Sequence, residues 1–282
     1  MAPLVSVVIP NHDYARYVGQ ALDSVLAQTY RPFEVIVVDN GSTDGSLEVL
    51  GAYADRCRIV AQPDLGQSRA RNRGIAEARG DLIAFLDADD AWRPRKLELQ
   101  VERFERDAAV ALVYCSLEVA DADLRPSGAV VRASVRGDAL GEFVRWPGRA
   151  IVVGGESTAV VRRAALDVVG VFEPSLSISG GWDLWRRIAT HYRIDLVEDP
   201  LVLYRQHGSG LHRRLAAYEA DVRSASARMF ADPAAARIRG SRRAYEAGLD
   251  LMFAKSWLRH RDLGRAVRLA MRAAATRALA AR

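Results

Sequence analysis

Three aspartates end a short apolar run and thereby restrict the folds that are open to this chain. The run at residues 82–86 contains no polar residue and is followed by Asp87, Asp89 and Asp90. A continuous apolar run of this length is typical of a strand buried on both faces in a parallel α/β sheet. Ligands bind at the carboxyl ends of such strands, where one or two carboxylates hold Mg²⁺ together with substrate phosphates. We therefore predict a metal–diphosphate site; the alternative is an acidic turn that caps a helix beginning near Trp92.

The first 115 residues alternate between apolar runs and segments with helical spacing. Strands are expected at residues 5–10, 33–38, 58–62, 81–86 and 110–115, with a helix after each of the first four. This alternation predicts a parallel, doubly wound sheet. Neither a GxGxxG nor a Walker A sequence occurs, so neither a dinucleotide site nor a P-loop is indicated.

The rest of the chain divides into a less regular part and a helical part. Helices are expected at residues 161–169 and 182–191 and a strand at residues 197–204. From about His212 the pattern is wholly helical, and it ends in two amphipathic stretches separated at residues 262–264. We therefore predict an α/β domain over residues 1–210 and a basic helical extension over residues 211–282.

The charge of the chain is unevenly placed. Residues 212–282 contain 16 Lys and Arg against 6 Asp and Glu, a net charge of +10, and the rest of the chain carries −5. A basic tail suits an anionic partner, and the segment Ala266–Arg282 has an apolar stripe of Val267, Met271 and Leu279, so peripheral contact with an anionic membrane is one hypothesis. The alternative is that the arginines form solvated helix faces. Stacking aromatics do not interleave with the basic residues, so no nucleic-acid partner is expected.

Several absences bear on location. The sequence contains no run of about 18 uncharged apolar residues, so no transmembrane helix is expected. The N-terminus enters the first expected strand without a basic leader, which argues against a signal peptide. Cys57 and Cys115 lie far apart, with no Cys or His at metal-ligand spacing, as is typical of a reduced protein. We expect a cytoplasmic protein, peripheral at the membrane if it contacts one.

Four polar segments each follow an expected strand, at Pro10–Asp13, Asp39–Asp44, Gly66–Gly74 and Asp87–Asp90. Their order and spacing resemble family 2 glycosyltransferases of the GT-A fold, densely over residues 4–104 and more loosely as far as residue 208. The resemblance implies an α/β GT-A domain that transfers a sugar with inversion from a nucleoside-diphosphate sugar, for which UDP is the expected nucleotide. The cofactor would be Mn²⁺ or Mg²⁺, and the acceptor the hydroxyl of a glycan, a lipid-linked molecule or another compound.

The resemblance also assigns residues to the nucleotide end of the donor. His12 takes the place of an aromatic residue against the base, next to Pro10. Asp39 falls where the family contacts the base or ribose, and Asn40 replaces a frequent second aspartate there. Arg71, in the sequence Ala-Arg-Asn-Arg-Gly, would face the base or the diphosphate.

At the sugar–diphosphate end, the resemblance assigns Asp87 and Ala88 to donor binding and Asp89 to the metal. His207, in a Tyr-Arg-Gln-His sequence, would be a further metal ligand. Asp90 is expected to cap the following helix or to orient its neighbours.

The expected catalytic base is the point at which the chain departs from the family pattern. Inverting transfer needs a group that takes the proton of the acceptor hydroxyl, and the Glu-Asp pair that supplies it in the family aligns here with Gly180 and Gly181. Asp183 could serve after a local shift, or Glu156 could approach from another loop. Alternatively, the protein binds nucleotide sugars with weak or no transfer, or, less plausibly, it is a nucleotidyltransferase.

Overall fold

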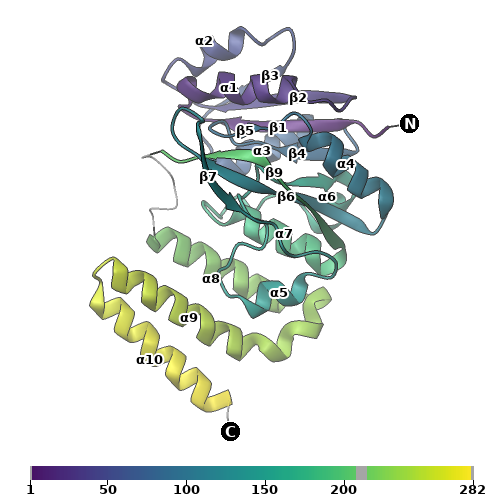
Figure 1. Cartoon of the computed structure of the whole chain (residues 1–282). Coiled ribbons are helices and arrows are strands. Elements are labelled where there is room, and N and C mark those ends of the chain that lie inside the picture. Colours follow the sequence, from purple (N-terminus) through teal and green to yellow (C-terminus); the bar gives the residue numbers. More distant parts are fainter. Residues whose placement is uncertain (1, 208–214, 281–282) are drawn as a thin grey trace.

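Strand β1 (Val5–Asn11) is the centre of the predicted parallel sheet. The computed structural model describes residues 2–207 and 215–280, with residues 279 and 280 as backbone only. In it, β1 pairs in parallel with β2 (Phe33–Asn40) and β4 (Leu82–Phe85), and β3 (Arg58–Gln62) extends the sheet beyond β2. The predicted parallel strands of the N-terminal part are thus confirmed, and their carboxyl ends lie along one edge on the left of Figure 1.

The other half of the nine-stranded sheet is mixed, which corrects the expectation of a wholly parallel arrangement. β8 (Val160–Arg162) lies antiparallel between β4 and β6 (Val110–Ala120), where the sequence suggested only a helix. β9 (Arg193–Arg205) runs parallel to β6 and pairs antiparallel with the short β5 (Ala91–Trp92). β7 (Pro126–Val131) pairs with β6 but is not part of the main row of neighbouring strands. A three-residue strand is too short for its periodicity to separate it from the helix that follows.

Side chains of β1 point alternately to the two faces of the sheet, so each face has apolar residues against which helices pack. Val7 packs in a core with apolar residues of α1 (Ala15–Leu26) and α4 (Lys96–Arg106), and α2 (Ser46–Gly51) closes the edge of this layer with Leu50.

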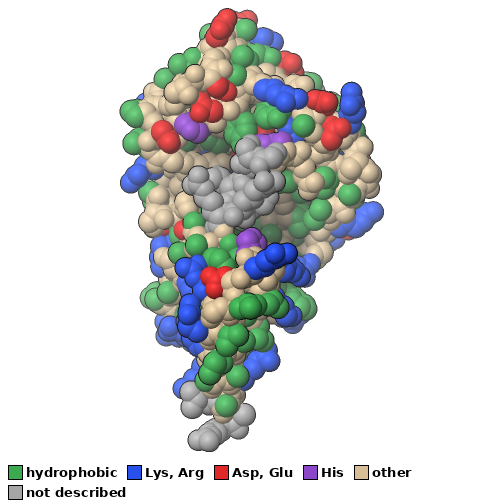
Figure 2. All heavy atoms as spheres, turned by 90° about the vertical axis from the view of Figure 1, so that its left-hand side faces the viewer, with side chains coloured by type: hydrophobic (Ala, Val, Ile, Leu, Met, Phe, Trp, Pro, Cys, Tyr) green, Lys and Arg blue, Asp and Glu red, His purple; other side chains and the backbone are tan. Residues whose placement is uncertain are grey.

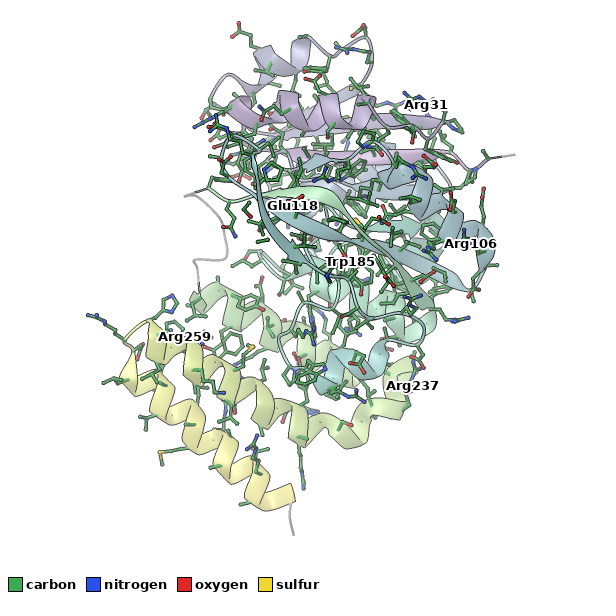
Figure 3. All side chains as sticks on the ribbon, viewed as in Figure 1. Arg31, Arg106, Glu118, Trp185, Arg237 and Arg259 are labelled. Atoms are coloured by element: carbon green, nitrogen blue, oxygen red, sulfur yellow. The ribbon has the colours of Figure 1, made fainter. Side chains whose placement is uncertain are left out.

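The opposite face receives Val8 of the same strand. It packs with apolar residues of α3 (Gln67–Glu77), α6 (Arg163–Val169) and α7 (Gly180–His191). Trp185 of α7, labelled in Figure 3, lies in this second core below the sheet.

The C-terminal helices form a third core beneath the second one (Figure 1). It contains residues of α8 (Leu215–Ala231), the 3₁₀ segment η2 (Pro233–Ser241), α9 (Arg242–Arg259) and α10 (Leu263–Ala280). The helix α5 (Leu140–Arg145) also contributes side chains and so joins this layer to the sheet. The helical character predicted for the tail is confirmed for residues 215–280, whereas the predicted boundary between residues 210 and 211 lies outside the described residues.

Gly74 lets α3 approach β1 more closely than any larger residue would allow. A Cβ atom at this position would overlap the Cγ1 atom of Val8. The close approach matters to the site because α3 also carries Arg71, one turn earlier.

We predict that Gly74→Ala destabilises the fold by about 1–3 kcal/mol, the usual cost of overpacking a core. The matched control is Gly51→Ala in α2, where an added Cβ would meet no atom within 4 Å. The control should be neutral or slightly stabilising because alanine favours a helix over glycine. Urea unfolding of both variants measures the difference, and equal stabilities would contradict the close-packing argument.

Candidate active site

Two adjoining cavities lie at the carboxyl ends of the parallel strands. Their volumes are about 710 and 520 Å³, and they share Pro10, Tyr14 and Gln67 as lining residues. Figure 2 looks onto this side of the molecule. Most residues predicted for the site line one of the two cavities: Pro10, His12, Asn40, Arg71, Asp87, Ala88, Asp89 and His207.

The larger cavity contains a carboxylate–imidazole pair. Asp89 Oδ2 lies 2.8 Å from His207 Nε2, although the two residues are 118 positions apart in the sequence. Burial raises the pKa of Asp89, as does the negative charge of Asp87, while His207 opposes the shift. The carboxylate oxygens and the imidazole nitrogen fit a divalent cation. Since no group of three candidate ligands occurs among the described residues, such a cation would need further ligands from a substrate.

Asp90 is turned away from the cavity and holds the acidic turn in place. Its side chain is buried, its Oδ2 accepts a 2.6 Å hydrogen bond from Ser157 Oγ, and its Oδ1 accepts one of 2.9 Å from the Arg205 backbone N–H. The Ser157 hydroxyl in turn accepts from the Asp87 N–H at 3.1 Å. Asp90 therefore ties together the acidic turn, the end of β9 and the loop that carries Glu156.

Arg71 projects from α3 into the interior and is 3% exposed. Its Nη2 donates to Asp87 Oδ1 at 2.7 Å, and its Nη1 lies 3.3 Å from Glu156 Oε1. One buried cation thus pairs with two carboxylates that both line the larger cavity.

The smaller cavity is lined by polar groups from three strand ends. The Nδ1 atom of His12 lies 2.8 Å from the carbonyl oxygen of Asn40, and Asn40 Nδ2 donates to Asp64 Oδ1 at 2.6 Å. Almost half of the His12 side chain is exposed, so its ring is accessible to a planar ligand. Asp64 was not predicted, although it follows the third strand just as the predicted segments follow theirs.

Asp39 lines neither cavity, so its position does not support the predicted contact with base or ribose. The residue is 1% exposed. Its carboxylate accepts hydrogen bonds from Asn11 Nδ2 at 2.9 Å, from Ser42 Oγ at 2.6 Å and from the Ser42 N–H at 3.1 Å. These three donors occupy the side chain in holding the loop after β2.

Asp183 also lies away from both cavities, so its position does not support the interpretation that it is the base. Its carboxylate is buried with Arg187 Nε at 2.8 Å, Arg186 Nη2 at 3.2 Å and Arg228 Nη2 at 3.6 Å. A helix turns by about 100° per residue, so a position two residues after Gly181 faces nearly the opposite side of α7. Glu156, the second alternative, does line the larger cavity.

Two tyrosines that were not predicted from the sequence, Tyr14 and Tyr204, also line the larger cavity. Burial raises the pKa of Tyr14, which hydrogen-bonds to Asp89, and burial and the nearby aspartates raise that of Tyr204. Tyr14 comes two residues after His12, so its position directly after the first polar segment was the available signal.

Comparison with known proteins identifies the family. Residues 6–169, more than half of the chain, match the family model described as Glycosyl transferase family 2. An uncharacterized glycosyltransferase of Nostoc sp. is 33% identical over 222 residues, which is 74% of this chain and 66% of that protein. The putative teichuronic acid biosynthesis glycosyltransferase TuaG of Bacillus subtilis is 38% identical over 124 residues, 42% of this chain and 49% of TuaG. The chain therefore spans less than two thirds of either relative.

Solved structures confirm the predicted GT-A fold. S. aureus TarS 1-349 in complex with UDP-GlcNAc superposes with a TM-score of 0.68 at 13% identity, covering 95% of this chain and 90% of that one. The mannosyltransferase PcManGT of Pyrobaculum calidifontis, in complex with GDP-Man and Mn²⁺, gives 0.65 at 21% identity, covering 100% and 76%.

Removal of the buried cation should destabilise the protein in a pH-dependent way. We predict that Arg71→Met lowers the free energy of unfolding by about 3–5 kcal/mol at neutral pH, because two buried carboxylates lose their partner. Burial raises the pKa of Glu156 and Arg71 opposes the rise, so without Arg71 the pKa of Glu156 in the folded variant should lie further above its unfolded value. The loss should therefore shrink as the pH falls and Glu156 takes up a proton.

The matched control is Arg73→Met on the same helix. Arg73 is 52% exposed and pairs with Glu77, and an exposed pair contributes little to stability. Chemical unfolding of both variants at several pH values provides the comparison. A deficit for Arg71→Met that does not change with pH would contradict the ion-pair argument.

Proposed function

The chain belongs to glycosyl transferase family 2, whose members transfer glycosyl groups, and on this basis we propose that it uses a nucleoside-diphosphate sugar as donor. The observation that carries the proposal is the pair of adjoining cavities, one with Asp89 beside His207 and the other with His12 beside Asn40 and Asp64. Transfer goes to an acceptor hydroxyl with inversion at the anomeric carbon.

The smaller cavity suits the nucleoside. The exposed ring of His12 can stack on a base, and Asn40 and Asp64 present amide and carboxylate groups for hydrogen bonds to base or ribose. UDP is the proposed nucleotide, which finds support in the UDP-GlcNAc bound by the similarly folded TarS. Pro10 lines both cavities and would lie where the nucleoside meets the diphosphate.

The larger cavity suits the diphosphate and the sugar. Asp89 and His207 would hold Mn²⁺ or Mg²⁺, which, when bound, neutralises charge on the departing diphosphate. Asp87 and the backbone at Ala88 lie beside them and would bind the sugar or ribose. Arg71 lines this cavity, is fixed between two carboxylates, and would orient Asp87 beside the diphosphate.

We also propose that the C-terminal helices attach the enzyme to an anionic membrane, where a lipid-linked acceptor would be available. Leu263, Val267 and Met271 of α10 follow one another at four-residue spacing and are 57–68% exposed. Arg265, Arg268 and Arg272 line a groove beside them, whose polar lining includes Glu219 of α8. Figure 2 shows hydrophobic side chains edged by Lys and Arg over this lower part of the molecule.

This surface fits the bilayer interface, where apolar side chains enter the acyl boundary and arginines meet lipid phosphates. No helix in the described part of the chain is both long enough and apolar enough to cross a bilayer. The side chain of Leu279, the third member of the predicted stripe, lies outside the described residues.

Donor binding is tested by thermal shift with UDP, GDP, CDP and dTDP, each with and without Mn²⁺. UDP with Mn²⁺ should produce the largest shift, which corresponds to about 2.7 kcal/mol at 100 times the dissociation constant. Asp89→Ala should lose the shift, whereas Asp55→Ala, at a side chain that is 78% exposed, should keep it.

The absence of a shift with every nucleotide would refute the donor site. Release of UDP from a UDP sugar separates a glycosyltransferase from a nucleotidyltransferase, which would release pyrophosphate. Binding without release of UDP would favour a nucleotide-sugar-binding protein without transferase activity.

Membrane attachment is tested by sedimentation with vesicles of phosphatidylglycerol and phosphatidylcholine at low salt. The double variant Val267→Asp, Met271→Asp should bind tenfold or more weakly, since each buried apolar side chain contributes about 1.5–3 kcal/mol. Val168→Asp, at an exposed position of α6, is the control. Equal sedimentation of the three proteins, or equal binding to pure phosphatidylcholine, would rule out the proposed surface.

A further inference from the structure

The start of α7 has no side chain at Gly181, and the carboxylate of Glu156, which lines the larger cavity, lies where one would be. A Cβ atom on Gly181 would lie 2.5 Å from Glu156 Oε1, which is closer than real Cβ atoms approach, and 3.0 Å from its Cδ atom. The glycine and the glutamate are therefore complementary. A carboxylate from the loop before β8 occupies the place that a side chain of α7 would otherwise take.

The loop that carries Glu156 is held firmly. Gly154 and Gly155 have φ values of +72° and +60°, a conformation that favours glycine. Ser157 is bound to the acidic turn through Asp90, and the Thr158 hydroxyl donates to the Val153 carbonyl oxygen at 2.6 Å. The carboxylate is thus presented to the cavity by a fixed backbone.

Among the residues that line the described part of the larger cavity, three are acidic: Asp87, Asp89 and Glu156. Asp89 is paired with His207 and is assigned to the cation, and Asp87 accepts the shorter contact of Arg71. Glu156 is 12% exposed, and of the two ion-pair contacts of Arg71 it has the longer, 3.3 Å. Of these three acidic side chains, Glu156 is the one that has no role in the proposed donor binding.

We propose that Glu156 is the general base of the transfer reaction, an inference that rests on the proposed function. One of its carboxylate oxygens takes the proton of the acceptor hydroxyl while the hydroxyl oxygen forms a bond to the anomeric carbon. The bond between that carbon and the diphosphate oxygen breaks, and its electron pair leaves with the nucleoside diphosphate. Glu156 ends the step as a neutral acid and returns the proton to solvent.

The surroundings of Glu156 suit this role. Burial raises its pKa, the positive charge of Arg71 opposes the shift, and the negative charge of Asp87 adds to it. The Gly181 backbone N–H donates a hydrogen bond that favours the charged form, and Tyr204 is a further titratable group nearby. A base is most effective when its pKa approaches the working pH, and a raised carboxyl pKa moves in that direction.

The first experiment measures UDP released from UDP-glucose and UDP-GlcNAc with water as the acceptor, together with UDP binding by thermal shift. Glu156→Gln should bind UDP and Mn²⁺ as the wild type does but turn over about 100-fold or more slowly, the usual contribution of a general base. Glu198→Gln, at a side chain that is 75% exposed, is the control and should keep full activity.

The pH dependence provides a second measurement. Because the charged form of Glu156 is required, wild-type turnover should fall as the pH drops through its raised pKa. This acid limb should be lost in Glu156→Gln and kept in Glu198→Gln. An unchanged acid limb would remove Glu156 from the proton transfer.

A relocation experiment uses the complementarity of the two positions. Glu156→Ala removes the carboxylate and opens the space, and the added change Gly181→Asp supplies a carboxylate from α7. The turnover of the double variant should be at least tenfold higher than that of Glu156→Ala. Gly181→Asp alone should lose activity, since its Cβ atom would lie 2.5 Å from Glu156 Oε1 and displace that carboxylate.

The outcomes separate the two proposals. A wild type that binds no nucleotide refutes the proposed function itself. A wild type that releases UDP, with Glu156→Gln retaining activity within threefold, overturns the role of Glu156 and leaves the transferase intact. A wild type that binds UDP sugars without releasing UDP overturns both the transfer reaction and its base. Circular dichroism and the retained UDP shift establish that each variant is folded.

Discussion

The guanidinium of Arg71 lies between the carboxylates of Asp87 and Glu156, and the arrangement of the larger cavity depends on this buried pairing. Two carboxylates with little access to water would repel each other and incur a large desolvation cost without a cation between them. The position of Arg71 depends in turn on Gly74, because only glycine lets α3 approach Val8 closely. The close packing of α3 on β1 therefore determines where the positive charge of Arg71 lies in the site.

The mixed half of the sheet completes a site that the parallel half begins. β1, β2, β3 and β4 bring four polar segments to one edge, as parallel strands must. The later strands add groups from distant sequence: β9 returns His207 to Asp89, and the loop before β8 delivers Glu156. Asp90 accepts hydrogen bonds from Ser157, in the loop before β8, and from the Arg205 backbone at the end of β9. It therefore links both of these segments to the acidic turn. Asp89 and Glu156 thus reach the same cavity from different segments and have different neighbours, so the two carboxylates can have different roles.

The direction of a side chain can be inferred from sequence when it follows from the residue's place at a strand end. Asp87 and Asp89 directly follow a buried strand, and both line the larger cavity. Asp39 and Asp183 lie at the expected positions along the chain, but their side chains point into the protein. In each case local partners decide the direction, Ser42 and Asn11 for Asp39 and a group of arginines for Asp183. Such partners belong to the packed structure and have no periodic signal in the sequence.

The sequence by itself determined the family, the parallel first half of the sheet and the acidic turn, because these depend on local order and spacing. It also indicated that Gly180 and Gly181 leave the expected place of a catalytic carboxylate vacant. Only the tertiary structure decided which acidic side chain fills that place. Glu156 lies 25 residues before Gly181 in the numbering, and the two meet because α7 and the loop before β8 pack against the same strand ends. Asp183 is close to Gly181 in the sequence, but the helical rotation places it on the other side of α7. Glu156 is distant in the sequence and lies next to Gly181 in space.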